Sequence, residues 1–372
     1  MHIPSTFASA LGAPASAALG FLGRLAAVPP PAVLSPASSP VAGGAGDGVL
    51  MAGRVRAVLL EMGVAAADAD VALAGALAAA GLPLTASALA EAHGALAGAP
   101  QATPTALVLA KTLALPATPD VLTALTAVMR ASGTPLGTLN FAEPALADLL
   151  GELGLAVEAG DDPARQARGL REMALHLGQS TEHRLATQGH GVADLRTALL
   201  RLSGETNEPG LRHAADGLAR LVEGQQLLNQ AALTQPPAHT GSALYLAFPL
   251  AFGGFYSTAE ARVWLPEPGA GDEADVEAPA LRVTLRVTPP RLGRVQADLC
   301  GHPSGSLSCR LGAERPASAR LLTRHTGGLA AMLAHAGWPS CDVSCRAQAA
   351  WPPLWPGAGA VTTPRSSVDR HV

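Results

Sequence analysis

The sequence predicts an α+β protein with a disordered N-terminus, an all-α N-terminal half and a small α+β domain near the C-terminus. Apolar and polar residues alternate over 281–287, which is the period of a strand with one buried face. The alternation returns over 295–299 and 306–311, on either side of a Pro/Ser/Gly turn that is typical of a hairpin. From Pro316 to Gly337 the apolar spacing becomes that of an amphipathic helix. These observations predict a mixed sheet with one main helix.

Composition limits the classes of protein to which the chain can belong. Its 372 residues leave room for two or three domains. A net charge of −4 argues against nucleic acid or an anionic membrane as a partner attracted by bulk charge. Aromatic residues are only 3% of the chain, so each core buries few large side chains and we expect marginally stable domains. No window has the roughly 20 large apolar residues of a membrane helix, so membrane insertion is not expected.

The N-terminal half is predicted to begin with a disordered segment. Residues 1–53 are rich in Ala, Pro, Ser and Gly without periodicity, a composition typical of disorder. No basic residue precedes Arg24, so a secretory signal peptide is not expected. A first helical region follows over 54–155. In it Thr85 and Thr118 each end a Leu-Pro phrase and lie where an N-cap residue belongs, which predicts short helical hairpins.

The second helical region is predicted to span 156–234, with helices over about 181–188, 192–202 and 211–233. The last of these helices has apolar residues at a coiled-coil-like spacing that lasts under four heptads. A coiled-coil dimer and a helix packed within its own domain both agree with this stripe. Its short length favours the packed helix.

The α+β domain is predicted to span 235–347, with its core at 281–347. Two further strands are expected at Leu244–Phe248 and Ala261–Leu265, before an acidic loop at 266–280. Within the core the expected order is strand, strand, strand, helix, strand.

A Pro- and Ser-rich tail over 348–372 is predicted to be disordered. In it Trp351, Leu354 and Trp355 stand between prolines. They suggest either a docking peptide or a tail without a partner, and the second interpretation is slightly favoured.

No arrangement of residues predicts catalysis. The chain has no nucleophile elbow, phosphate-binding loop, dinucleotide fingerprint or metalloprotease motif. The spacings of its cysteines differ from the paired C-x2-C of zinc sites, and we expect these residues to act as small hydrophobic side chains. They are Cys300, Cys309, Cys341 and Cys345. The acidic residues of 272–277 lack the pattern of a calcium loop. We therefore expect no enzyme, no cofactor and no metal site.

The sequence of the C-terminal core resembles a known family. Leu292-Gly293-Arg294-Val295, the hairpin after it, the Leu322–Gly337 helix ending in Gly-Trp and the Val343 strand are similar to the C-terminal domain of bacterial flagellar hook-length control proteins. The chain departs from the family pattern at Pro290, where an acidic residue is usual. The phrases Gly81–Thr85 and Glu223–Leu228 extend the resemblance into the helical half.

The resemblance implies a partner-binding or structural role for eight residues of this motif. They are Pro289, Leu292, Gly293, Val295, Leu322, Leu329, Leu333 and Gly337. By the same resemblance, Pro289, Leu292 and Gly293 shape a turn between core strands. Exposed faces of the Ala317–Ala336 helix, or neighbouring loops, would then contact the partner.

The function implied by the resemblance is control of flagellar hook length. Such a protein is made in the cytoplasm and exported through the flagellar type III apparatus, with an export signal in its first residues. Its C-terminal domain contacts the cytoplasmic domain of the export gate, and hook or hook-cap subunits are further partners. This contact switches export specificity without catalysis. The alternatives are a needle-length regulator of an injection-type secretion system and a cytoplasmic helical adaptor.

Overall fold

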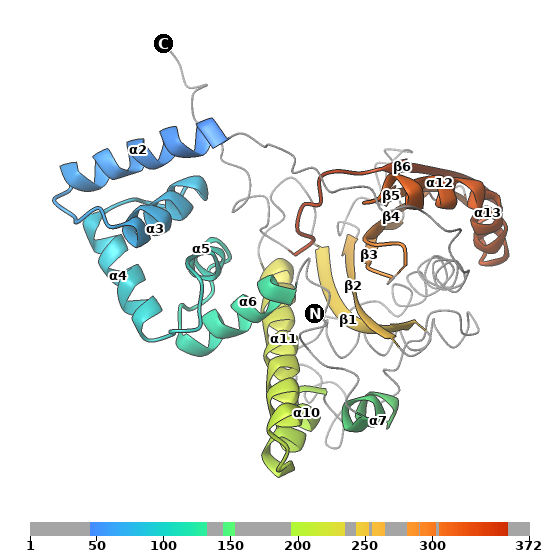
Figure 1. Cartoon of the computed structure of the whole chain (residues 1–372), viewed down its shortest axis with the longest axis horizontal. Helices are drawn as coiled ribbons and strands as arrows, with labels where there is room; N and C mark the ends of the chain where they lie inside the picture. Colours follow the sequence, from blue (N-terminus) through green and yellow to red (C-terminus); the bar gives the residue numbers. More distant parts are fainter. Residues whose placement is uncertain are drawn as a thin grey trace. The chain divides into compact units, whose positions relative to one another are not determined.

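The computed structural model shows an α+β protein, which confirms the predicted fold class. It describes residues 45–131, 144–152, 195–234, 243–252, 255–264, 281–289, 291–302 and 305–355. The chain divides into two compact units, a helical one that contains α2–α5 and most of α6, and one that contains a six-stranded sheet (Figure 1). Among the described residues, none of the helices is both long and apolar enough to cross a membrane.

Among its described residues, the helical unit has five helices. They are α2 (Ala45–Glu61), α3 (Asp68–Ala79), α4 (Ala86–Ala97), α5 (Pro104–Thr112) and α6 (Pro119–Ala131). Thr85 caps α4 as predicted, because its side chain accepts a hydrogen bond of 3.1 Å from the N–H of Ala88. Pro119 is the first residue of α6, where its missing N–H costs nothing. Helix α2 begins at Ala45, before residue 54, where the sequence predicts the end of disorder.

In the part of the chain that the structure describes, three more helices come before the sheet in the sequence. They are α7 (Pro144–Glu152), α10 (Leu195–Glu205) and α11 (Pro209–Thr234). Helix α11 packs against α10 and against the first strand, so it is a helix packed within its own unit. Ser203 and Asp216 join α10 to α11 through a hydrogen bond of 2.5 Å. The predicted helix at 181–188 lies outside the described residues.

The sheet has its six strands in sequence order. They are β1 (Ala243–Phe252), β2 (Phe255–Trp264), β3 (Leu281–Val287), β4 (Val295–Gly301), β5 (Ser306–Ala313) and β6 (Ser340–Ala347). The first five are antiparallel to one another, and β6 is parallel to β5, so the sheet is mixed as predicted. Strand β1 continues through Pro249, where the sequence predicts a connector. An edge strand tolerates proline because one side of its backbone needs no partner strand.

The register separates the side chains into an apolar face and a polar face of the sheet. Val283 pairs with Leu299, and Leu299 pairs with Cys309, so these buried side chains lie on the apolar face. Arg286 pairs with Glu260 and with Gln296 on the polar face. Helices α12 (Pro316–Arg324) and α13 (Thr326–His335) pack on β6, and α12 also on β5.

The prediction of one main helix is wrong in one respect, because α12 and α13 are separate helices. The chain leaves helical geometry at His325, which has φ −109° and ψ 6°. Gly327 and Gly328 follow this break, and glycine weakens a helix because it loses more backbone entropy than any other residue. Leu322 and Leu329 are nevertheless both fully buried, so the apolar stripe continues across the break.

The prediction of a disordered tail is wrong for residues 348–355. Leu354 is 6% exposed and Trp355 is 3% exposed, so this segment is packed against the rest of its unit. Its Pro-rich composition favours disorder, but large apolar side chains and a matching surface outweigh that tendency.

Candidate functional site

The first part of the predicted motif forms the turn between β3 and β4. The carbonyl of Pro289 accepts hydrogen bonds from the N–H of Leu292 (3.2 Å) and of Gly293 (3.1 Å). Gly293 has φ +71°, a left-handed conformation that favours glycine. A Cβ at this position would lie 3.0 Å from Nε of Arg315 and 3.3 Å from Oε2 of Glu314. The left-handed backbone therefore requires glycine here, whereas the exposed Arg315 and Glu314 side chains would only have to shift slightly.

This turn is fixed beneath the start of α12. The hydroxyl of Ser318 donates a buried hydrogen bond of 2.7 Å to the carbonyl of Leu292. The Leu292 side chain is 3% exposed, and Val295 at the start of β4 is fully buried. A change at Leu292 would therefore disturb the turn, the strand and the helix together.

The remaining motif residues fix the helical layer. Leu322, Leu329 and Leu333 are fully buried. Gly337 has φ +99° and ends α13, and the next residue, Trp338, donates its N–H to the carbonyl of Leu333 at 3.1 Å. This is the hydrogen bond of a Schellman C-cap.

Seven of the eight motif residues are therefore buried, and Gly337 lies in an exposed turn. The buried seven are Pro289, Leu292, Gly293, Val295, Leu322, Leu329 and Leu333. The structure brings them together around the β3–β4 turn and the helical layer. Because these seven residues are buried in the folded domain, they can affect a partner only by holding the exposed residues around them in place. Their role in partner binding stays a prediction.

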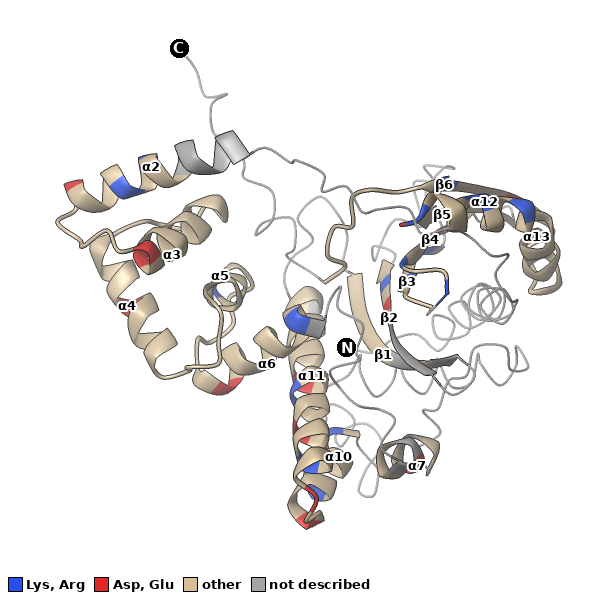
Figure 2. Cartoon of the chain, viewed as in Figure 1, with Lys and Arg blue, Asp and Glu red and all other residues tan. Residues whose placement is uncertain are grey.

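The outer surface of α12 is basic. Residues 316–335 contain no Asp or Glu. Arg320 and Arg324 are exposed and one helical turn apart, and Arg315 is exposed just before α12. Figure 2 shows basic positions along α12 in blue. This basic surface, defined by these three arginines, has the charge to attract an acidic partner. The spacing of the apolar residues predicts the helix. The basic surface has to be found separately, from the charges of the residues between them.

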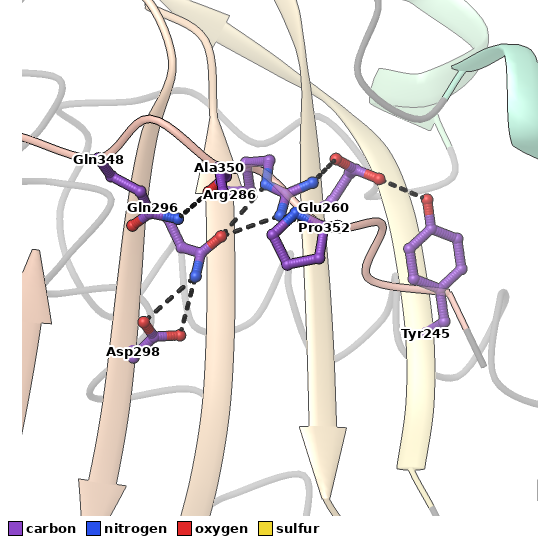
Figure 3. A network of polar contacts seen from close by, with 8 residues as sticks. All are labelled: Tyr245, Glu260, Arg286, Gln296, Asp298, Gln348, Ala350 and Pro352. Atoms are coloured by element: carbon purple, nitrogen blue, oxygen red, sulfur yellow. Dashed lines mark hydrogen bonds and ion pairs between the residues drawn. The ribbon is translucent and has the colours of Figure 1, made fainter. Parts of the chain in front are cut away.

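A buried polar network lies on the polar face (Figure 3). Arg286 donates from Nη2 to Oε1 of Gln296 (2.9 Å), and its Nη1 lies 3.5 Å from Oε2 of Glu260. The hydroxyl of Tyr245 donates to Oε1 of Glu260 (2.8 Å), and Gln296 donates to Asp298 (3.1 Å). Burial lowers the pKa of Arg286, and the Glu260 carboxylate opposes this shift. Alternation alone assigns these positions to solvent, so sequence reasoning misses the network.

The edge of β1 is closed by side chains of α11. Gln225 accepts from the N–H of Ala247 (2.6 Å) and donates to its carbonyl (2.9 Å). Asn229 forms the same pair of bonds with Tyr245, at 2.7 Å and 2.9 Å. Two side-chain amides thus take the place of a neighbouring strand. Gln225 belongs to the Glu223–Leu228 phrase, to which the sequence assigned no structural role.

The four cysteines are all free thiols. Cys309 is fully buried, and burial raises the pKa of its thiol from 9.0 to about 12, so it is neutral at physiological pH. Cys341 donates to the carbonyl of Trp338 at 2.9 Å. Within the described residues, His, Cys, Asp and Glu side chains form no group of three or more that could hold a metal ion.

Comparison with known families identifies the C-terminal domain. Residues 270–350 match the family model described as flagellar hook-length control protein FliK. The match contains β3 to β6 with α12 and α13, and it does not reach the helical half, where the resemblance stays a prediction. No curated protein and no solved structure matches the chain. The C-terminal region of this chain therefore carries the domain of the flagellar hook-length control family.

Proposed function

We propose that the protein controls flagellar hook length and switches the specificity of type III export by a non-catalytic contact with the export gate. The match of residues 270–350 to the hook-length control family is the observation that carries this proposal. The chain is made in the cytoplasm and leaves the cell through the flagellar export apparatus. Its C-terminal domain touches the cytoplasmic domain of the gate, and hook or hook-cap subunits meet the chain on its way out.

The basic surface of α12 is the surface that we assign to the gate contact. Arg320 and Arg324 are exposed, residues 316–335 contain no acidic side chain, and Arg315 lies next to the exposed Glu314 just before the helix. Charges of one sign on a surface increase the rate of encounter with a partner of opposite charge and fix its orientation. The gate should therefore present carboxylates to this helix.

Easy unfolding agrees with export through a narrow channel. Aromatic residues are 3% of the chain, and the cysteines of the domain are free thiols that do not cross-link it. Gly327 and Gly328 lie at the start of α13 and weaken that helix. Each feature lowers the free energy of unfolding that export must overcome.

The charge reversal Arg320→Glu with Arg324→Glu tests the gate contact. Both residues are exposed, so the domain should keep its fold while the contact is lost. Cells carrying this variant in place of the natural gene should form hooks longer than normal with few filaments, as measured by electron microscopy of hook–basal bodies. Arg201→Glu, an exposed arginine on α10, is the matched control and should leave hook length unchanged. Hooks of normal length in the double variant would reject the proposed surface.

Leu292→Asp tests the role of the domain itself. A charge at this buried position disrupts the β3–β4 turn, so switching should be lost together with the fold, as followed by circular dichroism. Normal hooks and filaments in a strain with the unfolded variant would refute the proposed function. Absence of the wild-type protein from the culture medium of flagellated cells would favour a cytoplasmic adaptor instead.

A further inference from the structure

Residues 348–355, called the strap below, cross the polar face of the sheet. We infer that this face is a binding site for an extended Trp-Pro peptide, and that the chain fills the site with its own strap. Figure 3 shows the strap passing over the strands that carry Gln296 and Arg286. The inference does not depend on the proposed function.

The centre of the site is Arg286. Its Nη2 donates a hydrogen bond of 2.6 Å to the carbonyl of Pro352. The ring of Trp351 packs against two guanidinium groups, with its centroid 5.7 Å from Cζ of Arg286 and 5.6 Å from Cζ of Arg294. Both distances are within the range of cation–π attraction. The site therefore recognises an aromatic ring followed at once by a backbone carbonyl.

The same face shows this mode of packing a second time. Trp264 of β2 lies against two guanidinium groups, 4.8 Å from Cζ of Arg262 and 4.4 Å from Cζ of Arg282. On this face, therefore, a tryptophan ring covers a pair of arginine side chains at two places. The strap brings Trp351 to the sheet from outside, whereas Trp264 is a residue of the sheet itself, and each ring packs against two guanidinium groups.

Both ends of the strap are anchored. At its start, the N–H of Gln348 donates to the carbonyl of Ala313 at 2.9 Å, which continues the pairing of β5 with β6. Gly312 lies under the side chain of Gln348, where any Cβ would collide with it. At the other end Leu354 and Trp355 are buried. Close fit at several positions distinguishes a built site from a loose tail.

The site keeps its polar partners without the strap. Arg286 is held by Gln296 and Glu260, both on neighbouring strands, and Thr284 donates to Asp298 at 2.7 Å. The strap adds one hydrogen bond to Arg286. Its departure therefore leaves no carboxylate unpaired, and water can take the place of the Pro352 carbonyl. Such a surface can open and close without unfolding of the sheet.

Proline suits the segment that occupies the site. Pro352 and Pro353 have no N–H to satisfy and a fixed φ, so the strap is already extended before it docks and loses little entropy. The occupant that we assign is the chain's own Trp351–Trp355 segment. Any competitor must present the same order, an aromatic residue followed by prolines and a second aromatic residue.

Peptide binding to the full chain tests the inference. In one variant, Trp351→Ala with Trp355→Ala weakens the strap and leaves every residue of the sheet in place. A fluorescent peptide copying residues 348–356 should bind this variant at least tenfold more tightly than it binds the wild-type chain, as measured by fluorescence anisotropy. A peptide with both tryptophans changed to alanine should not bind. Adding Arg286→Gln to the variant chain should abolish binding of the natural peptide.

Equal binding of the natural and the alanine peptides, or no binding to a variant whose circular dichroism shows a folded domain, would overturn the inference. A dimer with exchanged straps would overturn the assignment of the occupant to the same chain.

Hydrogen exchange of the wild-type protein gives a second readout that needs no substitution. The amide of Gln348, which donates to the carbonyl of Ala313, should exchange faster than those of β4, because the strap opens locally. Exchange of this amide and those of β4 at one common rate would show that the strap leaves only when the domain unfolds, and would reject the inference.

Discussion

The two faces of the sheet are covered in different ways. On the apolar face α12 and α13 cover β5 and β6, and their Leu322, Leu329 and Leu333 are fully buried. The polar face carries Arg286 and Glu260, each only 3% exposed, and part of its cover is a strap of eight residues. One sheet thus has a cover held by apolar burial and a cover held by stacking, a charge-assisted hydrogen bond and, at its end, the burial of Leu354 and Trp355.

The two covers differ in the free energy that it costs to detach each of them from the sheet. Exposing a buried leucine costs about 1.5–3 kcal/mol, so loss of the three leucine contacts removes much of the stability of a small domain. A cation–π contact at a partly exposed site contributes about 0.5–1 kcal/mol. Release of the strap breaks two such contacts and exposes Leu354 and Trp355, but it unfolds no helix or strand, so the strap can be exchanged whereas the helical cover is part of the fold. Four predictions sharpen this comparison.

The largest effect is expected on the apolar face. Leu322→Ala with Leu329→Ala removes two fully buried side chains, and each change of this kind costs about 2–5 kcal/mol. The sum is comparable to the whole stability of a small domain, so the variant should be largely unfolded in urea titrations followed by circular dichroism. Ala334→Ser, on the exposed side of α13, should leave the midpoint unchanged. A stable double variant would show that the helices are not a fixed cover.

A smaller effect is expected when the polar network is broken. Arg286→Met leaves the Glu260 carboxylate buried without its cation, which should cost about 3 kcal/mol. Adding Glu260→Gln removes that charge and should restore part of the stability. A double-mutant cycle from urea unfolding measures this coupling. Strictly additive costs would mean that the two side chains do not depend on each other.

A modest effect is expected at the strap. Trp351→Ala removes contacts with two guanidinium groups and should cost about 1–2 kcal/mol at most. The change should increase proteolysis within 348–355 and leave that of β4 unaltered, as read by mass spectrometry of the fragments. A loss as large as that of the leucine variant would make the two covers equivalent and remove the distinction between them.

The smallest effect at neutral pH is expected at Cys309, on the apolar face. Burial raises the pKa of its thiol from 9.0 to about 12. The unfolded thiol therefore loses its proton first, and the free energy of unfolding should fall as pH rises from about 9 to about 12. Below pH 9 the Cys309 thiol is protonated in both states and adds no pH dependence to the free energy of unfolding. The fall should be smaller in Cys309→Ala, which urea titrations at pH 8 and pH 10.5 can measure; identical slopes would show that water reaches the thiol.

The apolar face could be predicted from the sequence, and the polar face could not. Alternation at Val283 and Leu285 and helical spacing at Leu322 and Leu329 report burial directly, because apolar residues at a fixed period have one physical explanation. Arg286 gives the opposite signal. A charged residue in a strand predicts a solvated position, unless a partner far away in sequence covers it, and that partner is Pro352.

The division of the predicted helix was missed for a different reason. Leu322 and Leu329 keep the same face across the break at His325, so the stripe continues while the backbone does not. Gly327 and Gly328 signal a weak helix, but they do not say where the break falls. Thr85 and Pro119 were predictable because their roles depend on neighbours within a few residues.

The amide pairs of α11 have a consequence for how the sheet ends. Gln225 and Asn229 are four residues apart on a helix, a rise of about 6 Å, and Tyr245 and Ala247 are two residues apart on a strand, a rise of about 6.8 Å. These two spacings nearly coincide, so side chains four residues apart on a helix can form the hydrogen bonds that a neighbouring strand would form with two residues of β1. The sheet can therefore stop at β1 without offering those two residues to another chain, which limits fibre-like stacking wherever many copies are concentrated together.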